Sequence, residues 1–196
     1  MAHLESNLPH TVVLKEGDPV TIRCIVPEDA PRLQALLKRL SQESIFYRFL
    51  EYLKELSDKQ AVELASVDYR SRMALVGTRI QDGEELVIGV ARYSVQSEAE
   101  PDAAEVGVVV EDPYQNQGLG THLLKELTQY AREHGIRYFK GYISHQNRRI
   151  LKFIQKSGLP TERRLEMGMW EITVDLQQQA APGGSQKSTG AENGAG

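Results

Sequence analysis

A glycine-rich turn between an apolar segment and an amphipathic segment constrains this chain more than any other feature. The turn reads Gln-Asn-Gln-Gly-Leu-Gly at 115–120, follows the apolar run 106–110, and precedes a helical pattern that begins near Thr121. Glycine lets the backbone approach a ligand closely, because it carries no Cβ. Free backbone N–H groups at a helix N-terminus bind phosphate oxygens. Strand, turn and helix together predict a pyrophosphate site for ATP, a dinucleotide or coenzyme A.

Two differences from known phosphate-binding motifs narrow the choice of ligand. Gly120 is followed by Thr121 and His122, so the Lys-Ser or Lys-Thr pair of a P-loop is missing. Leu123 occupies the place of the third glycine in a dinucleotide fingerprint. The remaining pattern, Gln-x-x-Gly-x-Gly, resembles the acetyl-CoA loop of the GCN5-related N-acetyltransferases (GNAT). The alternative is that the glycines serve only the geometry of a tight strand-to-helix connection.

Composition argues against several other classes of protein. The chain has 196 residues, of which 40% are apolar and 26% charged, as expected for one soluble domain with its own core. A net charge of −4, with no stretch rich in Lys and Arg, argues against a nucleic-acid partner. We see no apolar run that would cross a bilayer and no signal peptide, so we expect no membrane partner and a cytoplasmic location. The single cysteine, Cys24, is expected to be a buried packing residue, and the scattered histidines predict no metal site.

The hydrophobic pattern predicts an α/β fold with three layers and a mixed sheet. Strands are expected at 20–26, 73–80, 86–95, 104–110, 138–143, 163–167 and 169–174. Helices are expected from 27 to about 40, 58–66, 119–134 and 148–157, whereas 44–50 is expected to be irregular. Asp58 is expected to cap its helix, and Val62 to lie on the apolar side of that helix. Residues 1–17 are predicted to be a flexible segment, 18–176 the folded domain, and 177–196 a disordered tail.

The order of elements over roughly 20–174 resembles the GNAT fold, and more narrowly the catalytic domain of bacterial Pat-type protein lysine acetyltransferases. The segments that carry the resemblance are 22–30, 40–44, 47–49, 53–57, 68–70, 73–76, 88–93, 104–106 and 147–151. The resemblance implies a three-layer α/β/α fold with a central mixed, mostly antiparallel sheet. It also implies transfer of an acetyl group from acetyl-CoA to a lysine ε-amine of a protein, notably an acyl-CoA synthetase.

Within that resemblance, site residues are assigned by position. Glu105, on the strand before the glycine turn, matches the catalytic glutamate, and its neighbours on one strand face are Gly107 and Val109. A neutral amine needs a base in reach, because a free lysine has a pKa of about 10.4. The alternative is an exposed strand carboxylate in an ion pair. The residues expected to bind the cofactor are Val108, Val109, Val110, Gln115, Gln117, Gly118, Leu119, Gly120, Thr121 and Asn147.

These cofactor residues divide by role. Val108 and Val110 are expected to offer backbone groups to the pantetheine arm, while residues of the glycine turn hold the pyrophosphate. Asn147 is expected to hydrogen-bond the pantetheine, with a plain N-cap as the alternative. A tyrosine that many small-molecule acetyltransferases use as a general acid is replaced by Ile154. With no defensible nucleophile in the chain, we expect direct attack in a ternary complex.

Three functions remain open at this stage. The first is a protein lysine acetyltransferase. The second keeps acetyl-CoA but acetylates a small-molecule amine. The third is a non-catalytic module that binds acetyl-CoA.

Overall fold

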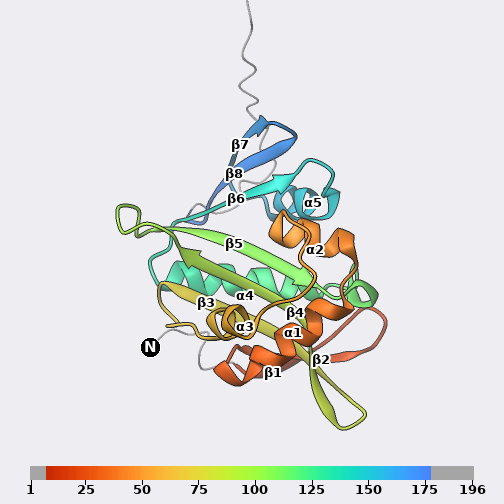
Figure 1. The fold of residues 1–196 in the computed structure, drawn as a ribbon. Coiled ribbons are helices and arrows are strands. Elements are labelled where there is room, and N and C mark those ends of the chain that lie inside the picture. Colours follow the sequence, from red (N-terminus) through yellow and green to blue (C-terminus); the bar gives the residue numbers. More distant parts are fainter. Residues whose placement is uncertain (1–7, 178–196) are drawn as a thin grey trace, which may run out of the picture.

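The computed structural model describes residues 8–177, in which eight strands form one sheet (Figure 1). The spatial order is β1-β2-β3-β4-β5-β6-β8-β7, and every neighbouring pair is antiparallel except β5 and β6, which are parallel. The strands are β1 (His10–Val13), β2 (Pro19–Cys24), β3 (Arg72–Gln81), β4 (Glu84–Val95), β5 (Ala103–Val110), β6 (Tyr138–Ser144), β7 (Thr161–Glu166) and β8 (Met169–Asp175).

Helices cover both faces of the sheet. The α-helices are α1 (Ala30–Arg39), α2 (Gln42–Phe49), α3 (Asp58–Ala65), α4 (Leu119–Glu133) and α5 (Arg148–Ser157), and two 3-10 turns lie at Pro27–Asp29 (η1) and Asp112–Tyr114 (η2). In Figure 1, α4 lies behind the sheet, whereas α1 and α3 lie in front of it. The predicted three-layer α/β/α arrangement with a mixed, mostly antiparallel sheet is confirmed.

Two apolar cores separate these layers. The α4 core lies between α4 and the sheet, and the α1–α3 core lies on the opposite face. Strand β5 serves both, because its side chains alternate between the faces. Val106, Val108 and Val110 pack against the α4 core, whereas Val109 packs against the α1–α3 core. The inner face of α4 is formed by four buried side chains: Leu123, Leu124, Leu127 and Tyr130.

The pairing of β5 differs on its two sides. Towards β4 the register runs without interruption from Ala104 opposite Val95 to Val110 opposite Gly89. Towards β6 it includes three residues, from Ala103 opposite Tyr138 to Glu105 opposite Lys140. Beyond Glu105 the two strands no longer pair and their ribbons diverge (Figure 1), and we call the space between the later part of β5 and β6 the gap.

Four local expectations are wrong. Residues 1–17 were expected to carry little regular structure, but His10–Val13 form β1, which pairs with β2 along its whole length. Residues 44–50, expected to be irregular, lie largely in α2, whose N-cap Ser41 accepts a hydrogen bond from the Ser44 N–H. The cap of α3 is Ser57 rather than Asp58. Val62, placed on the apolar side of that helix, is 51% exposed. The tail predicted for 177–196 lies outside the described residues except for Gln177.

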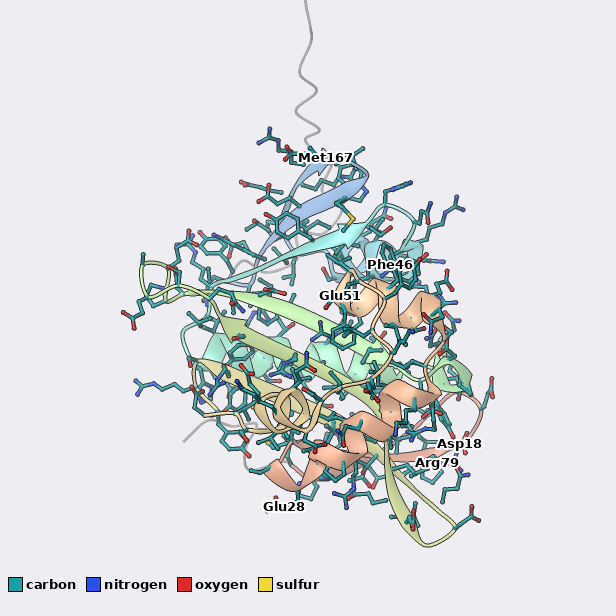
Figure 2. All side chains as sticks on the ribbon, viewed as in Figure 1. Asp18, Glu28, Phe46, Glu51, Arg79 and Met167 are labelled. Atoms are coloured by element: carbon teal, nitrogen blue, oxygen red, sulfur yellow. The ribbon has the colours of Figure 1, made fainter. Side chains whose placement is uncertain are left out.

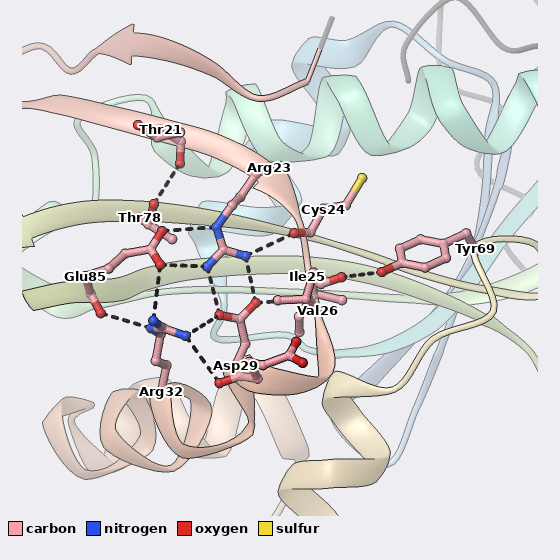
Figure 3. Close-up of polar contacts among 11 residues, drawn as sticks. Thr21, Arg23, Cys24, Ile25, Val26, Asp29, Arg32, Tyr69, Thr78 and Glu85 are labelled. Carbon is pink, nitrogen blue, oxygen red and sulfur yellow. Dashed lines mark hydrogen bonds and ion pairs between the residues drawn. The ribbon is translucent and has the colours of Figure 1, made fainter. Parts of the chain in front are cut away.

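An ion network joins β2, η1, α1 and β4 (Figure 3). Arg23 donates two hydrogen bonds to the Asp29 carboxylate, at 2.7 and 2.8 Å, and two to Glu85, at 3.0 and 3.1 Å. Arg32 adds a hydrogen bond of 3.1 Å to the same Asp29 carboxylate. The Asp29 side chain is fully buried. Burial by itself would raise its pKa, but hydrogen bonds from Arg23 and the Val26 N–H, with the charges of Arg23 and Arg32, bring it below 3.8.

Two peripheral features are visible among the side chains. Arg79 and Asp18 form an ion pair of 3.5 Å beside the β1–β2 connection (Figure 2). Met167 lies at the tip of the β7–β8 hairpin and is 97% exposed (Figure 2).

Candidate functional site

The glycine turn places the N-terminus of α4 at the end of β5. Gly118 is the N-cap of α4 and adopts φ +105°, in the left-handed region that favours glycine. The N–H groups of Thr121 and His122 donate to the Gly118 carbonyl at 2.9 and 3.1 Å. Helix geometry leaves the N–H groups of Leu119 and Gly120 without a partner inside the helix. These donors, at the positive end of the helix dipole, are suited to bind an anion, and we call them the candidate anion site.

Leu119 fixes the position of this helix N-terminus. Its side chain is fully buried against Gly77 and Gly89, which face each other on β3 and β4. A Cβ on Gly77 would lie 2.8 Å from one Leu119 methyl group, and a Cβ on Gly89 would lie 3.0 Å from the other. The paired glycines therefore make room for Leu119, which leaves only its backbone N–H for a ligand.

The side chains of the two glutamines shape the loop instead of projecting into open space. Gln115 Nε2 donates to the Val110 carbonyl and to Ser44 Oγ, both at 2.9 Å, and its Oε1 accepts a hydrogen bond from Arg149. Gln117 is 6% exposed, and its Nε2 donates to the Pro113 carbonyl at 2.7 Å. Both residues lie beside the candidate anion site, but their side-chain amides hold the loop to itself and to its neighbours.

Backbone alternation separates the three valines that were expected to bind the cofactor, of which Val108 and Val110 were assigned to the pantetheine arm. The Glu111 N–H donates to the Ile88 carbonyl on β4 at 2.8 Å, so Val109, two residues earlier, also directs its backbone groups towards β4. Val108 and Val110 direct theirs towards the gap. The Val110 carbonyl is already occupied by Gln115, while Val109 contributes its side chain to a pocket on the other face.

Glu105 is exposed and is the last β5 residue that pairs with β6. Its register partner on β6, Lys140, donates instead to Glu100, at 2.8 and 2.9 Å. The alternative of a strand carboxylate in an ion pair receives no support within residues 8–177, where no such pair of Glu105 occurs. The carboxylate therefore lies free at the point where the gap begins.

Two arginines that sequence reasoning missed lie close to Glu105. Arg92 is directly opposite Gly107 in the β4–β5 register. The guanidinium of Arg48, from α2, covers Gly107, and its Cζ lies 2.7 Å from the place of a Cβ there. The glycine inside β5 was the available signal, because such a residue marks a close approach of another group.

Local structural contacts occupy the side chains of Asn147, His145 and Glu111. Asn147 caps α5, and its Oδ1 accepts from the Ile150 N–H at 3.4 Å, as the N-cap alternative predicted. His145 is an exposed loop residue whose Nδ1 lies 2.7 Å from the Gly168 carbonyl. Glu111 forms an ion pair of 3.0 Å with Arg39. Cys24 was expected to be buried but is partly exposed.

Residues 8–177 contain neither a metal-binding cluster nor a membrane-spanning helix. No group of three or more His, Cys, Asp and Glu side chains is arranged to hold a metal ion. In the same range, none of the helices has the length and apolar character needed to span a membrane.

Comparisons with known proteins give the class of protein. Residues 34–159 match the model of the acetyltransferase (GNAT) family, and this match covers more than half of the chain. The chain therefore belongs to the GNAT family and is an N-acetyltransferase. The acetyl donor of this family is acetyl-CoA.

Particular relatives point to the Pat group. The GNAT domain of S. lividans PAT is 29% identical and superimposes with a TM-score of 0.76, covering 87% of this chain and 98% of that domain. An acetyltransferase of Pseudomonas aeruginosa, PA5475, is 34% identical over 135 residues, which are 69% of this chain and 72% of the relative. Acetyltransferase Pat of Mycolicibacterium smegmatis is 26% identical over 168 residues, which are 86% of this chain and 49% of the relative. The chain thus spans about half the length of that last protein.

A more distant structure shares the fold. The acetyltransferase yncA of Salmonella typhimurium, solved with its cofactor acetyl-CoA, is 18% identical with a TM-score of 0.62. That alignment covers 85% of this chain and 99% of yncA.

Proposed function

We propose that this acetyltransferase transfers the acetyl group of acetyl-CoA to a lysine ε-amine of a protein substrate, with Glu105 as general base. The observation that carries the proposal is the position of Glu105. Its carboxylate is exposed, carries no ion pair in the described chain, and stands where β5 leaves β6 and the gap begins.

Residues on both sides of this gap fit acetyl-CoA. The N–H groups of Leu119 and Gly120 suit a pyrophosphate, and the gap-facing backbone of Val108 suits the amide groups of a pantetheine arm. Asn147 lies at the start of α5, and its side-chain amide supplies one further polar group. Bound acetyl-CoA supplies an acetyl thioester, which is the electrophile of the reaction.

Glu105 then controls the proton on the acceptor. A lysine ε-amine is protonated at neutral pH, since its pKa is about 10.4. The Glu105 carboxylate accepts that proton directly or through a water molecule, which frees the nitrogen lone pair. The nitrogen forms the new C–N bond as the C–S bond breaks, and the sulfur leaves as a thiolate, which takes up the second proton that the nitrogen loses and becomes the thiol of coenzyme A. No residue of the chain becomes acetylated in this scheme.

The choice of a protein acceptor rests on the likeness to the Pat group. The match to the S. lividans PAT domain covers almost the whole of that domain, and we extend its class of substrate to this chain. An acyl-CoA synthetase is the first acceptor to test, because Pat-type domains acetylate such enzymes. A cytoplasmic site of action follows from such a substrate.

The test is to incubate the protein with acetyl-CoA and an acyl-CoA synthetase, and to locate new acetyl groups by mass spectrometry. We expect acetylation of a defined lysine, and loss of this product with Glu105→Gln. Release of coenzyme A with small amines, but with no protein, would replace the proposal by a small-molecule acetyltransferase. Binding of acetyl-CoA without transfer to any acceptor would indicate a binding module.

A further inference from the structure

Arg48 and Arg92 bring two guanidinium groups to the sheet face that also carries Glu105. Arg92 and Gly107 are register partners, so they occupy the same face of neighbouring strands. Gly107 offers no side chain, and the Arg48 guanidinium fills that place, with its Cζ and two Nη atoms 2.7–3.0 Å from the position of a Cβ. A larger residue at 107 would exclude Arg48, so the glycine makes the arginine pair possible.

The two cations have few partners for their charge. Arg92 donates one hydrogen bond of 3.2 Å to the Leu64 carbonyl, and Arg48 lies 4.9 Å from the centre of the Phe49 ring. Among residues 8–177, neither guanidinium forms an ion pair with a carboxylate. Glu105 attracts both arginines from a longer distance, and the exposed Glu63 attracts Arg92. Arg72 adds further positive charge near Arg92.

Burial makes the charged forms of these arginines less stable, because few groups compensate for the lost water. Desolvation lowers the pKa of Arg92 to about 10, with repulsion from Arg48 and Arg72 as further causes. Desolvation also lowers the pKa of Arg48. An anion that enters between the two groups would relieve both penalties, because charge-assisted hydrogen bonds are strongest away from water.

The arginines border a small pocket. Its other lining residues are nine apolar side chains from α1, α2, α3, β4, β5 and the adjoining loops, and its volume is about 40 Å³. One water molecule needs roughly 10–15 Å³ of such volume, so the pocket holds a group of about three heavy atoms. A carboxylate has this size, and its two oxygens match the planar fork of a guanidinium.

We propose that Arg48 and Arg92 form a carboxylate-binding site beside Glu105, so that the preferred substrate carries a carboxylate close to its reacting group. The inference rests on the proposed function, which places the transfer at Glu105. The carboxylate has two possible sources: the acyl group of the thioester, as in a dicarboxylic acyl-CoA, or an acidic side chain next to the target lysine.

The test compares two matched pairs of ligands by titration calorimetry. The donor pair is succinyl-CoA and butyryl-CoA, which both carry four-carbon acyl groups. The acceptor pair is a lysine peptide with Asp next to the lysine and the same peptide with Asn, titrated into protein saturated with coenzyme A. We expect the anionic member of one pair to bind more tightly, by about tenfold or more, because charge-assisted hydrogen bonds are the stronger kind. The pair that shows the preference identifies the source.

Variants assign the preference to the arginines. Arg48→Met and Arg92→Met should each remove most of the preference for the anionic ligand. Arg48→Lys keeps the positive charge but loses the planar guanidinium, so it should retain part of that preference. Gly107→Ala retains every charge but displaces the Arg48 guanidinium, so it should also reduce the preference. Arg70→Met is the matched control, because this exposed arginine lies outside the pocket, and it should leave the preference unchanged.

Two results would contradict the proposed carboxylate-binding site. Equal affinities within both pairs for the wild type would do so, as would a preference that persists in the Arg48→Met, Arg92→Met double variant. Calorimetry requires no turnover, so failure of the arginine site is distinct from failure of acetyl transfer. Absence of binding by all four ligands would count against both proposals.

Discussion

The Cδ1 atom of Leu119 lies only 2.8 Å from the position that a Cβ on Gly77 would take. This contact joins the first residue of α4 to the middle of β3, and so holds the candidate anion site at a fixed place over the sheet. The relationship gives the first prediction.

Gly77→Ala should lower the free energy of unfolding by about 1–3 kcal/mol, because the added methyl group overpacks a buried site. It should also weaken binding of coenzyme A, since Leu119 must move and α4 begins at that residue. Urea unfolding and calorimetry measure the two effects. Gly141→Ala is the control for stability, because its Cβ would meet the Val106 carbonyl oxygen at an ordinary 3.7 Å. Equal stability of Gly77→Ala and wild type would contradict the packing argument.

Glu105→Gln should reduce kcat by about a hundredfold or more, because the amide cannot accept the proton of the ammonium group. The dissociation constant of acetyl-CoA should stay within about twofold, since the donor residues are untouched. Steady-state release of coenzyme A measures the first quantity and calorimetry the second. The control is Glu84→Gln, an exposed change at the start of β4. A variant at Glu105 with unchanged turnover would remove this residue from its role as base.

Gly118→Val should abolish measurable binding of coenzyme A and destabilise the fold by about 1–3 kcal/mol, because a β-branched residue is strained at φ +105°. The matched control is Gly135→Val, just past the other end of α4, where φ is +82° and no atom lies within 4 Å of a Cβ. We expect a similar loss of stability in the control but normal affinity. Normal affinity in both variants would show that the phosphate site lies elsewhere.

Asp29→Asn should destabilise the fold at pH 7 by about 3 kcal/mol or more, because it removes the buried partner of Arg23. The pKa of Asp29 is lowered in the folded protein, so its contribution is complete above about pH 4 and disappears as the pH falls through the lowered value. The difference in unfolding free energy between variant and wild type should therefore shrink on acidification below pH 4. Urea titrations at pH 7 and pH 3 measure it, with the exposed change Asp82→Asn as control. A difference that stays constant with pH would refute this linkage.

Local patterns predicted the elements that form the donor side of the site. The alternation in β5, the glycine turn and the apolar stripe of α4 are each encoded within about ten neighbouring residues, so they can be read without tertiary information. The β3–β4 hairpin is also encoded by neighbouring residues, because Asp82 and Gly83 both adopt the positive φ that its tight turn requires.

The features that the sequence pattern did not predict depend on tertiary contacts. Helix α2 is short, and Asp112, about seventy residues away in sequence, accepts hydrogen bonds from its Ser41 and Ser44. Strand β1 has four residues and depends on β2 as its partner. The pairing of Arg48 with Arg92 depends on the register of β4 against β5. Periodicity within one segment cannot predict such relationships.

The two sides of the gap beside β5 are held by different numbers of register pairs. One side is β5 itself, which is tied to β4 by seven register pairs and is followed by Asp112 of η2, which accepts hydrogen bonds from Ser41 and Ser44. The other side begins with β6, which joins β5 through three register pairs and then diverges from it. Any change in the width of the gap therefore has to move β6 together with β8, because seven register pairs tie these two strands to each other.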